Sequence, residues 1–220
     1  MLSSNGNKWE MEMSTVRQNN LLILVEGARR DEEYDQMGRC VDQLLNELGD
    51  DTSPEAMRLR SKITYERHMA KFQQAVSFQA RADQAFQESL ELALLSDKEA
   101  RESGDEVGAL FAEMNISGLL LPALGGWRKG VVRSEKTCDR AEFIAAAKGT
   151  SEVDRKRAWQ VAMNTYFHRI RMIMTFGRGG KGAQFWVKRW LEHVKKNPIY
   201  LANQDKLRAD VEAAEKFIRE

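Results

Sequence analysis

Proline and β-branched residues are scarce in this sequence, and both shortages favour helices as its secondary structure. Only three prolines occur in 220 residues, at Pro54, Pro122 and Pro198, whereas Ala, Leu, Glu, Lys, Arg and Gln abound. A proline inside a helix removes a backbone donor and clashes with the preceding turn, so long helices need sequences that are poor in proline. The composition therefore predicts an all-α fold.

Cysteine is also rare. Cys40 and Cys138 are far apart in the chain and belong to no CxxC or Cys/His spacing. The sequence therefore gives no support for a disulfide framework or a zinc site. We expect two buried free thiols, and neither a metal nor another cofactor.

A long apolar run is missing as well. The apolar stretch from Leu21 to Val25 is far shorter than the roughly 20 residues that span a bilayer. The N-terminus lacks the basic start and apolar core of a signal peptide. We therefore expect a soluble cytoplasmic protein without a membrane partner, in which residues 1–14 form a flexible N-terminus.

The net charge is close to zero, but the charges are unevenly distributed. The formal net charge is +1. Ten acidic and three basic residues occur from Glu26 to Glu55, and eight acidic and two basic residues from Asp83 to Glu106. From Ser151 to Pro198 there are three acidic and eleven basic residues. Any preference for a charged partner must therefore be local.

Apolar residues recur every three or four positions along most of the chain, which is typical of amphipathic helices. Tyr34, Met37, Val41 and Leu44 form one such stripe. Breaks are expected at Gly49 to Ser53, around Ser103 to Asp105 and around Gly149 to Glu152. The predicted helices cover residues 15–27, 34–48, 54–70, 72–95, 105–124, 127–147, 159–175, 183–196 and 205–220.

A glycine-rich segment between two of these helices could bind phosphate or could simply be a turn. Residues Gly177 to Gly182 match the pattern G-x-G-x-x-G, and such a loop before a helix can cradle a phosphate group. A dinucleotide site also needs a preceding strand, but Trp159 to Thr175 mainly has the helical period. Gly182 also stands where a Walker sequence has Ser or Thr. A turn between helices is the favoured interpretation.

Residues that could perform catalysis do not form a recognisable set. The three histidines, His68, His168 and His193, have no second ligand at a spacing that suits a metal site. The acidic run from Asp31 to Asp35 lacks the alternation and the glycine of a calcium loop. No serine or cysteine lies in a nucleophile elbow. We therefore expect no enzymatic activity.

Two apolar stretches on either side of Gly125 and Gly126 predict a pair of antiparallel helices. Gly118 supplies a small residue in the first helix, Trp127 opens the second, and Gly130 follows three residues later. Small residues let two helix axes approach to about 8 Å. Pro122 should kink the first helix. Phe72, Ala75 and Ala82 repeat the pattern of an opening aromatic residue followed by small residues.

On these residues the chain resembles a tetratricopeptide-repeat (TPR) protein. The resemblance implies antiparallel helix pairs stacked as a right-handed α-solenoid over residues 15–204, closed by a C-terminal capping helix over residues 205–220. The opening aromatic residues Tyr34, Phe72 and Trp127 are 38 and 55 residues apart. These intervals exceed the family period of about 34 and imply longer helices or inserted segments.

The resemblance also implies a function, namely a non-catalytic scaffold that binds a peptide or partner helix in a helical groove. Proteins of this family hold peptides through exposed Asn, Arg and Lys side chains, and the basic half should prefer an acidic partner. The sequence also allows a homodimer, because a terminal helix can leave an apolar face uncovered for a second copy of the chain. The candidate partner-binding residues are Asn115, Arg169, Arg178, Lys181, Lys188 and Arg189.

The alternative function is binding of RNA or DNA through residues 155–196. This segment combines basic side chains with aromatic residues that could stack on bases. The aromatic residues are Trp159, Tyr166, Phe167, Phe185, Trp186 and Trp190. The same residues could instead form a buried helical stripe, so the sequence leaves both interpretations open.

Overall fold

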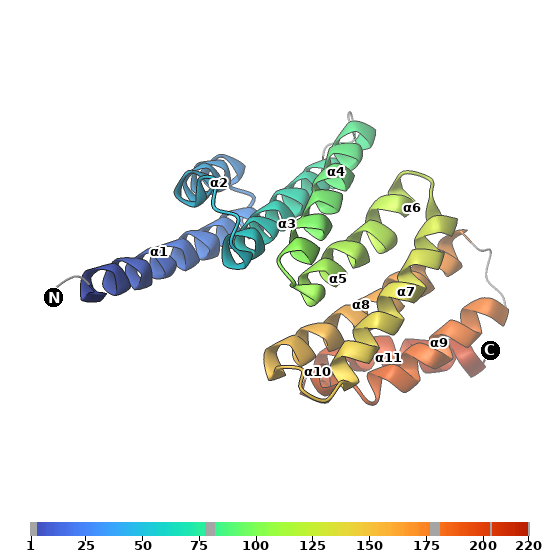
Figure 1. The fold of residues 1–220 in the computed structure, drawn as a ribbon. Helices are drawn as coiled ribbons and strands as arrows, with labels where there is room; N and C mark the ends of the chain where they lie inside the picture. Colours follow the sequence, from blue (N-terminus) through green and yellow to red (C-terminus); the bar gives the residue numbers. More distant parts are fainter. Residues whose placement is uncertain (1–3, 78–81, 177–180, 203, 220) are drawn as a thin grey trace. The chain divides into compact units, whose positions relative to one another are not determined.

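The structure is a computed structural model that describes residues 4–77, 82–176, 181–202 and 204–219 (Figure 1). Within these ranges, side chains are described from residue 15 onward, except at positions 82, 174, 181, 182, 199, 200, 204, 206, 207 and 210. All regular elements in the described ranges are helical, which confirms the predicted all-α class. None of the helices in these ranges is long and apolar enough to cross a membrane.

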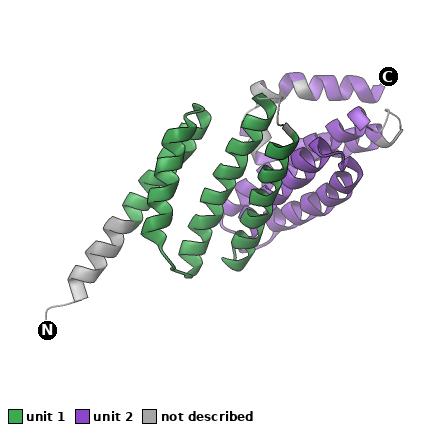
Figure 2. Cartoon of the chain, turned by 90° about the horizontal axis from the view of Figure 1, so that it is seen from above, with its two compact units in different colours: residues 1–104 green, residues 105–220 purple. Residues whose placement is uncertain are grey.

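The chain forms two compact units, residues 1–104 and residues 105–220, which we describe separately (Figure 2). The boundary lies at the predicted break around Ser103 to Asp105. Gly104 has a φ of +73°, a conformation that glycine adopts without steric cost. Asp105 then caps the next helix by accepting a hydrogen bond from the Gly108 N–H at 2.8 Å. The boundary divides the range 15–204 that the sequence suggested as one helical-repeat domain.

The described residues of unit 1 form four helices, α1 (Ser4–Arg30), α2 (Tyr34–Leu48), α3 (Pro54–Ser77) and α4 (Ala82–Glu102). Helix α1 begins at Ser4, so the predicted start of the first helix at residue 15 was wrong. The stretch before residue 15 contains no proline, and its Lys, Glu and Met residues are good helix formers, so a helix can extend through it.

Helix α3 is longer than predicted. It continues through Phe72 and Ala75 to Ser77, because no glycine or proline interrupts it after Ala70. The prediction that Phe72 opens a new helix was therefore wrong. Instead, the Phe72 ring in α3 packs against the Phe86 ring in α4, with 5.7 Å between ring centroids. Ala82 begins α4, and its side chain lies outside the described residues.

The apolar core of unit 1 lies between α1, α2 and α3. Val25, Leu44 and Ile63, one from each helix, are completely buried in it. Arg29 of α1 also pairs with Glu66 of α3, and burial raises the pKa of the Glu66 carboxyl. Unit 1 therefore brings the first helix pair onto α3.

Helices α3 and α4 pack through small residues. Ser61 Oγ donates to the Ser96 carbonyl oxygen at 2.9 Å, and Ser96 Oγ donates to the Ser61 carbonyl oxygen at 3.0 Å. One end of this interface holds His68, whose Nδ1 lies 2.9 Å from Ser89 Oγ. Burial lowers the pKa of His68 to about 4. Short side chains thus let the two backbones approach closely.

Unit 2 contains the remaining elements. They are α5 (Glu106–Asn115), the π-helix η2 (Ile116–Leu120), α6 (Leu121–Ala123), α7 (Trp127–Ala146), α8 (Glu152–Phe176), α9 (Lys181–Val194), α10 (Pro198–Ala202) and α11 (Gln204–Arg219). Its apolar core joins α5, α7, α8, α9 and α11. Helix α11 contributes the buried Val211 and the partly buried Ala214, Phe217 and Ile218. The role of α11 as the cap of a helical stack stays a prediction.

The irregularity predicted at Pro122 takes the form of a π-helical segment before it. The N–H of Leu121 donates to the carbonyl oxygen of Ile116, five residues earlier. Such π-helical turns accommodate local disruption of the normal α-helical bonding. Pro122 itself lies at the start of α6, where its missing donor is tolerated. The predicted single helix over 105–124 is therefore interrupted.

The turn from α6 to α7 has the predicted position. Gly125 has a φ of +78°, and Trp127 is the first residue of α7. A Cβ at Gly130 would overlap the Ser117 carbonyl oxygen and come within 3.1 Å of Met172 Sδ. A Cβ at Gly118 would lie 2.7 Å from His168 Cβ. Both glycines therefore lie where backbone and neighbouring helices meet closely.

Candidate functional site

Asn115, one of the candidate partner-binding residues, lies in the interior of unit 2. It is the last residue of α5 and only 3% exposed. Its neighbours in the chain, Met114 and Ile116, belong to the same buried stretch before Pro122. The prediction that Asn115 is exposed for peptide binding was therefore wrong, because packing around the π-helix encloses its side chain.

Arg169 is likewise buried, at 5% exposure. Its guanidinium carbon lies 3.4 Å from the centroid of the Trp186 ring, and its Nη2 lies 3.4 Å from Glu135 Oε2. Burial lowers the pKa of Arg169, which Glu135 partly counteracts. Arg169 therefore joins α7, α8 and α9 inside unit 2, and its predicted exposure to a partner was wrong.

Arg189 stands beside the same indole ring. Its guanidinium carbon is 5.2 Å from the Trp186 centroid, and its Nη2 is 2.8 Å from Asp139 Oδ1. Glu135, Asp139 and Glu142 are spaced four and three residues apart, so they form a row of carboxylates along α7. The structure therefore brings Arg169 and Arg189 together, but against carboxylates of their own unit.

Glu142 ends this row and receives two hydrogen bonds. Tyr166 Oη donates to Glu142 Oε1 at 2.7 Å, and His193 Nδ1 lies 2.8 Å from the same oxygen. Burial acts to raise the pKa of Glu142, but the hydrogen bonds from His193 and Tyr166 outweigh it and hold the pKa below its ordinary value. Glu142 is therefore ionised at neutral pH and anchors both α8 and α9 to α7.

Cys138 lies next to this network without the character of a reactive thiol. Burial raises its pKa to about 12, so the thiol is protonated at neutral pH. Cys138 is buried and free, as predicted, and Cys40 is free but only half-buried. The network is built from groups whose charges serve to hold the three helices together.

The structure describes the other predicted basic residues to different extents. Lys188 is exposed on α9. Arg178 lies outside the described residues, and so does the side chain of Lys181 at the start of α9. The glycine-rich segment falls mostly in the undescribed range 177–180.

Most aromatic residues of the segment 155–196 are used inside unit 2. Tyr166 and Trp190 are buried, and Trp186 is covered by two arginines. Phe185 is 60% exposed and Phe167 is 48% exposed. A base-stacking surface in this segment would therefore depend on these two rings and Lys188.

Unit 1 contains an open groove between α2 and α3, with a volume of about 280 Å³. Helix α2 lines it with residues spaced three or four apart, α3 lines it from Arg67 to Gln74, and α4 adds Leu92. The lining residues are Tyr34, Met37, Gly38, Val41, Asp42, Leu45, Arg67, Ala70, Lys71, Gln74 and Leu92.

The floor of the groove is apolar and its rims are charged. Met37, Val41 and Ala70 are buried in the floor, where they also belong to the core of unit 1. Asp42 is exposed on the α2 rim and Arg67 on the α3 rim. A floor that is apolar with polar edges is the usual anatomy of a protein-binding surface.

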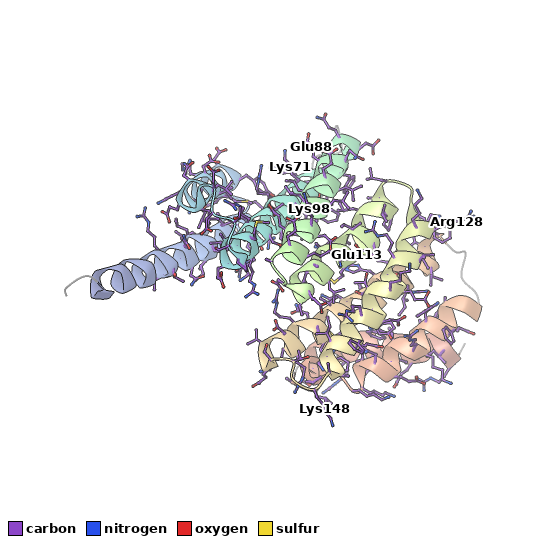
Figure 3. All side chains as sticks on the ribbon, viewed as in Figure 1. Lys71, Glu88, Lys98, Glu113, Arg128 and Lys148 are labelled. Atoms are coloured by element: carbon purple, nitrogen blue, oxygen red, sulfur yellow. The ribbon has the colours of Figure 1, made fainter. Side chains whose placement is uncertain are left out.

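Lys71, also on the α3 rim, is shared with α4. Its Nζ lies 2.9 Å from Glu88 Oε2, and the two side chains are 43% and 40% exposed (Figure 3). Hydrogen bonds from Lys71 and Gln84 hold the pKa of Glu88 below its ordinary value. Exposed pairs of this kind contribute little to stability, so Lys71 can exchange Glu88 for another carboxylate at small cost.

The sequence contained part of the signal for this groove. The stripe that begins at Tyr34 predicts an amphipathic helix with one buried face. Tyr34 and Leu45 are in fact only half-buried, because the stripe is wider than the surface that α1 covers. Which residues of α3 face this stripe is decided by the angle between two helices, and no local pattern encodes it.

A second hollow lies at the turn between α1 and α2. It is lined by Glu32, Glu33, Tyr34, Asp35, Gln36 and Arg39. The described part of the chain holds no group of three His, Cys, Asp or Glu side chains that could bind a metal ion. The acidic turn therefore has the character of a solvated surface.

We compared the chain with protein-family models, with curated proteins and with solved structures, and none of them matches it. The resemblance to TPR proteins therefore rests on the residues quoted for it, and stays a prediction.

Proposed function

We propose that this protein is a non-catalytic scaffold that holds a helical segment of a partner protein in the groove between α2 and α3. The apolar floor flanked by Asp42 and Arg67 is the observation that carries this proposal. A helix-in-groove complex needs an apolar trough that accepts side chains at positions i, i+3, i+4 and i+7. The regular spacing of the α2 lining residues provides a trough of this kind.

The dimensions of the groove favour a helix over a small molecule. Pockets for small molecules usually enclose about 300–1,000 Å³ and bury most of the ligand. This groove is smaller, and exposed residues such as Gly38 line it. Along α2 the lining runs from Tyr34 to Leu45, a length of about 16 Å at 1.5 Å per residue. Three turns of a partner helix fit along it.

The TPR-like solenoid is part of the same proposal. Two consecutive helix pairs, α1 with α2 and α3 with α4, support it, because each pair would be one unit of a stack. The groove then lies where two successive pairs meet, which is where helical-repeat proteins bind their partners. The right-handed stacking over the full chain remains an expectation.

A peptide library tests the proposal directly. The probe is a phage-displayed library of amphipathic helices about 18 residues long, which exceeds the length at which isolated helices are marginal. Apolar residues are varied at i, i+3, i+4 and i+7, and Glu, Lys or Gln at the flanking positions. Clones are selected on the full chain and then measured as labelled peptides by fluorescence anisotropy.

Gly38 supplies a matched pair of variants. No atom lies within 4 Å of the position that its Cβ would take, so a side chain there enters open space at the groove. Gly38→Phe should fill the groove and weaken peptide binding at least about tenfold, whereas Gly38→Ala should leave binding unchanged and favour helix α2. Equal binding to both variants, or no selected clones, would overturn the proposal.

Nucleic-acid binding is the competing outcome. A labelled oligo-uridine RNA, titrated against the full chain, should not bind at physiological salt. Tight binding that weakens steeply with salt, and that Phe185→Ala and Lys188→Glu reduce, would favour the segment 155–196 instead.

A further inference from the structure

The two helices that frame the groove carry opposite net charges. Helix α2 has three carboxylates, Asp35, Asp42 and Glu47, against the single arginine Arg39. Helix α3 has two carboxylates, Glu55 and Glu66, against five basic residues, Arg58, Arg60, Lys62, Arg67 and Lys71. Glu66 is also occupied by Arg29 of α1. Glu47 is likewise paired with Arg17 of α1, so α2 is weakly acidic overall and α3 is basic overall.

The same opposition occurs where a bound helix would touch the rims. Asp42 is the charged lining residue contributed by α2, whereas α3 contributes Arg67 and Lys71. Lys71 shares its charge with Glu88, so Arg67 supplies most of the positive potential on its side. A partner that presents one kind of charge on both edges would meet repulsion at one rim.

We propose, building on the proposed function, that the groove binds an amphipathic helix with acidic residues on one edge and basic residues on the other. The acidic edge faces Arg67 and Lys71, and the basic edge faces Asp42. The rim charges thereby decide in which of two opposite directions the helix lies.

Rim charges are needed to set the direction of the bound helix, because the burial of its apolar stripe favours neither direction. An apolar stripe buries about the same area when its helix is turned end for end, and the hydrophobic effect is non-directional. Turning the helix exchanges its two edges, so each edge charge would then face a rim of like charge. Charge complementarity in an interface acts mainly by excluding such arrangements. For these exposed pairs we expect the favoured direction to bind about tenfold more tightly than the reverse.

The selected peptides whose binding is weakened by Gly38→Phe provide the first test. They should carry Glu on one edge and Lys on the other more often than the same charge on both edges. Labelled peptides with Glu on both edges or Lys on both edges should bind about threefold to tenfold more weakly.

A photo-crosslinker on the N-terminus of one selected peptide provides the second test. On the unmodified protein it should label one end of α2, near either Tyr34 or Leu45. The double variant Asp42→Arg with Arg67→Asp exchanges the rim charges and keeps the net charge. On this variant the same peptide should label the opposite end of α2.

A control exchange on α4 leaves the groove untouched. Lys98 and Glu102 form an exposed pair, with 3.7 Å between Lys98 Nζ and Glu102 Oε1. Lys98→Glu with Glu102→Lys should therefore leave the labelled end unchanged. Thermal melts establish that both double variants fold. Arg67→Gln with Asp42→Asn, which removes the charges of these two residues and leaves Lys71 paired with Glu88, should give labelling at both ends.

The outcomes separate the two proposals. Gly38-dependent binding with the same labelled end in all variants would overturn the directional inference and leave the proposed function standing. The absence of any Gly38-dependent peptide would overturn both. Reversal in the rim exchange alone supports the inference.

Discussion

The two units join their helices in contrasting ways. In unit 1, part of the α3–α4 interface is formed by serines, and Ser61 and Ser96 exchange hydrogen bonds with each other's backbone. In unit 2, α7, α8 and α9 meet through aromatic rings, two arginines and a row of carboxylates. Close backbone approach requires small side chains, whereas the polar side chains of unit 2 join its helices through ion pairs, hydrogen bonds and ring contacts.

This difference explains why two basic residues of the most conspicuous charged segment are engaged inside unit 2. Arg169 and Arg189 are held by Trp186 and by carboxylates of α7. In unit 1, by contrast, α2 covers only part of α3, and Arg67 and Asp42 remain exposed along the resulting groove. A basic segment with aromatic residues can therefore be structural, while a less conspicuous stripe provides the groove.

The largest effect should come from adding one methyl group to a glycine in unit 2. Gly130→Ala places a Cβ against the Ser117 carbonyl oxygen, which belongs to the backbone and cannot move alone. We expect unit 2 to lose about 3 kcal/mol, near the upper end for overpacking, despite the better helix propensity of alanine. Hydrogen exchange measured by mass spectrometry reads the free energy of each unit separately.

Gly27→Ala is the control for this change. Gly27 lies in α1, and nothing is within 4 Å of its Cβ position. It should stabilise unit 1 by up to about 1 kcal/mol. If both alanines had the same effect, the close approach at Gly130 would be disproved.

A pH titration should expose the buried histidine of unit 1. A histidine in the unfolded chain has a pKa of 6.5, but folded His68 has a pKa of about 4, so the unfolded state binds more protons between these values. Stability is therefore fully present above about pH 6.5 and is lost as the pH falls toward 4, by at most about 3 kcal/mol.

His68→Asn removes this titrating group. Hydrogen exchange in α3 and α4 should then depend less on pH, while exchange in α8 keeps its dependence, since burial also lowers the pKa of His168 to about 4. Identical pH profiles of α3 and α4 in the two proteins would argue against the role of His68.

Removing one charge from the unit 2 network should have a moderate effect. Glu142→Gln keeps the size of the side chain but gives up the charged acceptor for Tyr166 and His193. Hydrogen bonds to charged groups contribute about 1.5–3 kcal/mol, and because Glu142 is partly exposed we expect a loss of about 1–2 kcal/mol in unit 2. Glu152→Gln, at an exposed pair with Lys156, is the control and should change little. Unchanged exchange in α9 of Glu142→Gln would contradict the prediction.

The smallest effect should come from the serine interface of unit 1. Ser96→Ala removes one hydrogen bond but keeps the close approach of α3 and α4. The expected loss is about 1 kcal/mol, the usual net contribution of a neutral hydrogen bond. Chemical denaturation with hydrogen exchange compares it with Ser77→Ala, at the exposed end of α3. A loss as large as that of Gly130→Ala would mean that the serines, rather than close approach, hold the pair.

Local sequence signals predicted several elements well. Gly49, Gly104 and Gly125 mark the ends of helices because each adopts a positive φ, and Trp127 opens α7. The boundaries failed where no glycine or proline was present. The sequence therefore suggested a break between Ala70 and Phe72 that α3 ignores.

The candidate site was predicted less well, for a physical reason. Asn115 and Arg169 are polar residues, and the sequence gives no indication that they are buried. Their burial depends on partners such as Trp186 and Glu135, which lie on other helices. Conversely, Leu45 has the appearance of a core residue, yet it lines the groove.

The sequence by itself determined the all-α class, the break at Gly104 and most helix ends, because helix propensity, capping and glycine conformations act over a few residues. Only the tertiary structure decided which charged side chains are paired inside unit 2 and which remain exposed on the rims of the unit 1 groove. That choice depends on the angles and separations at which helices pack, and these are set jointly by residues that are distant in the chain.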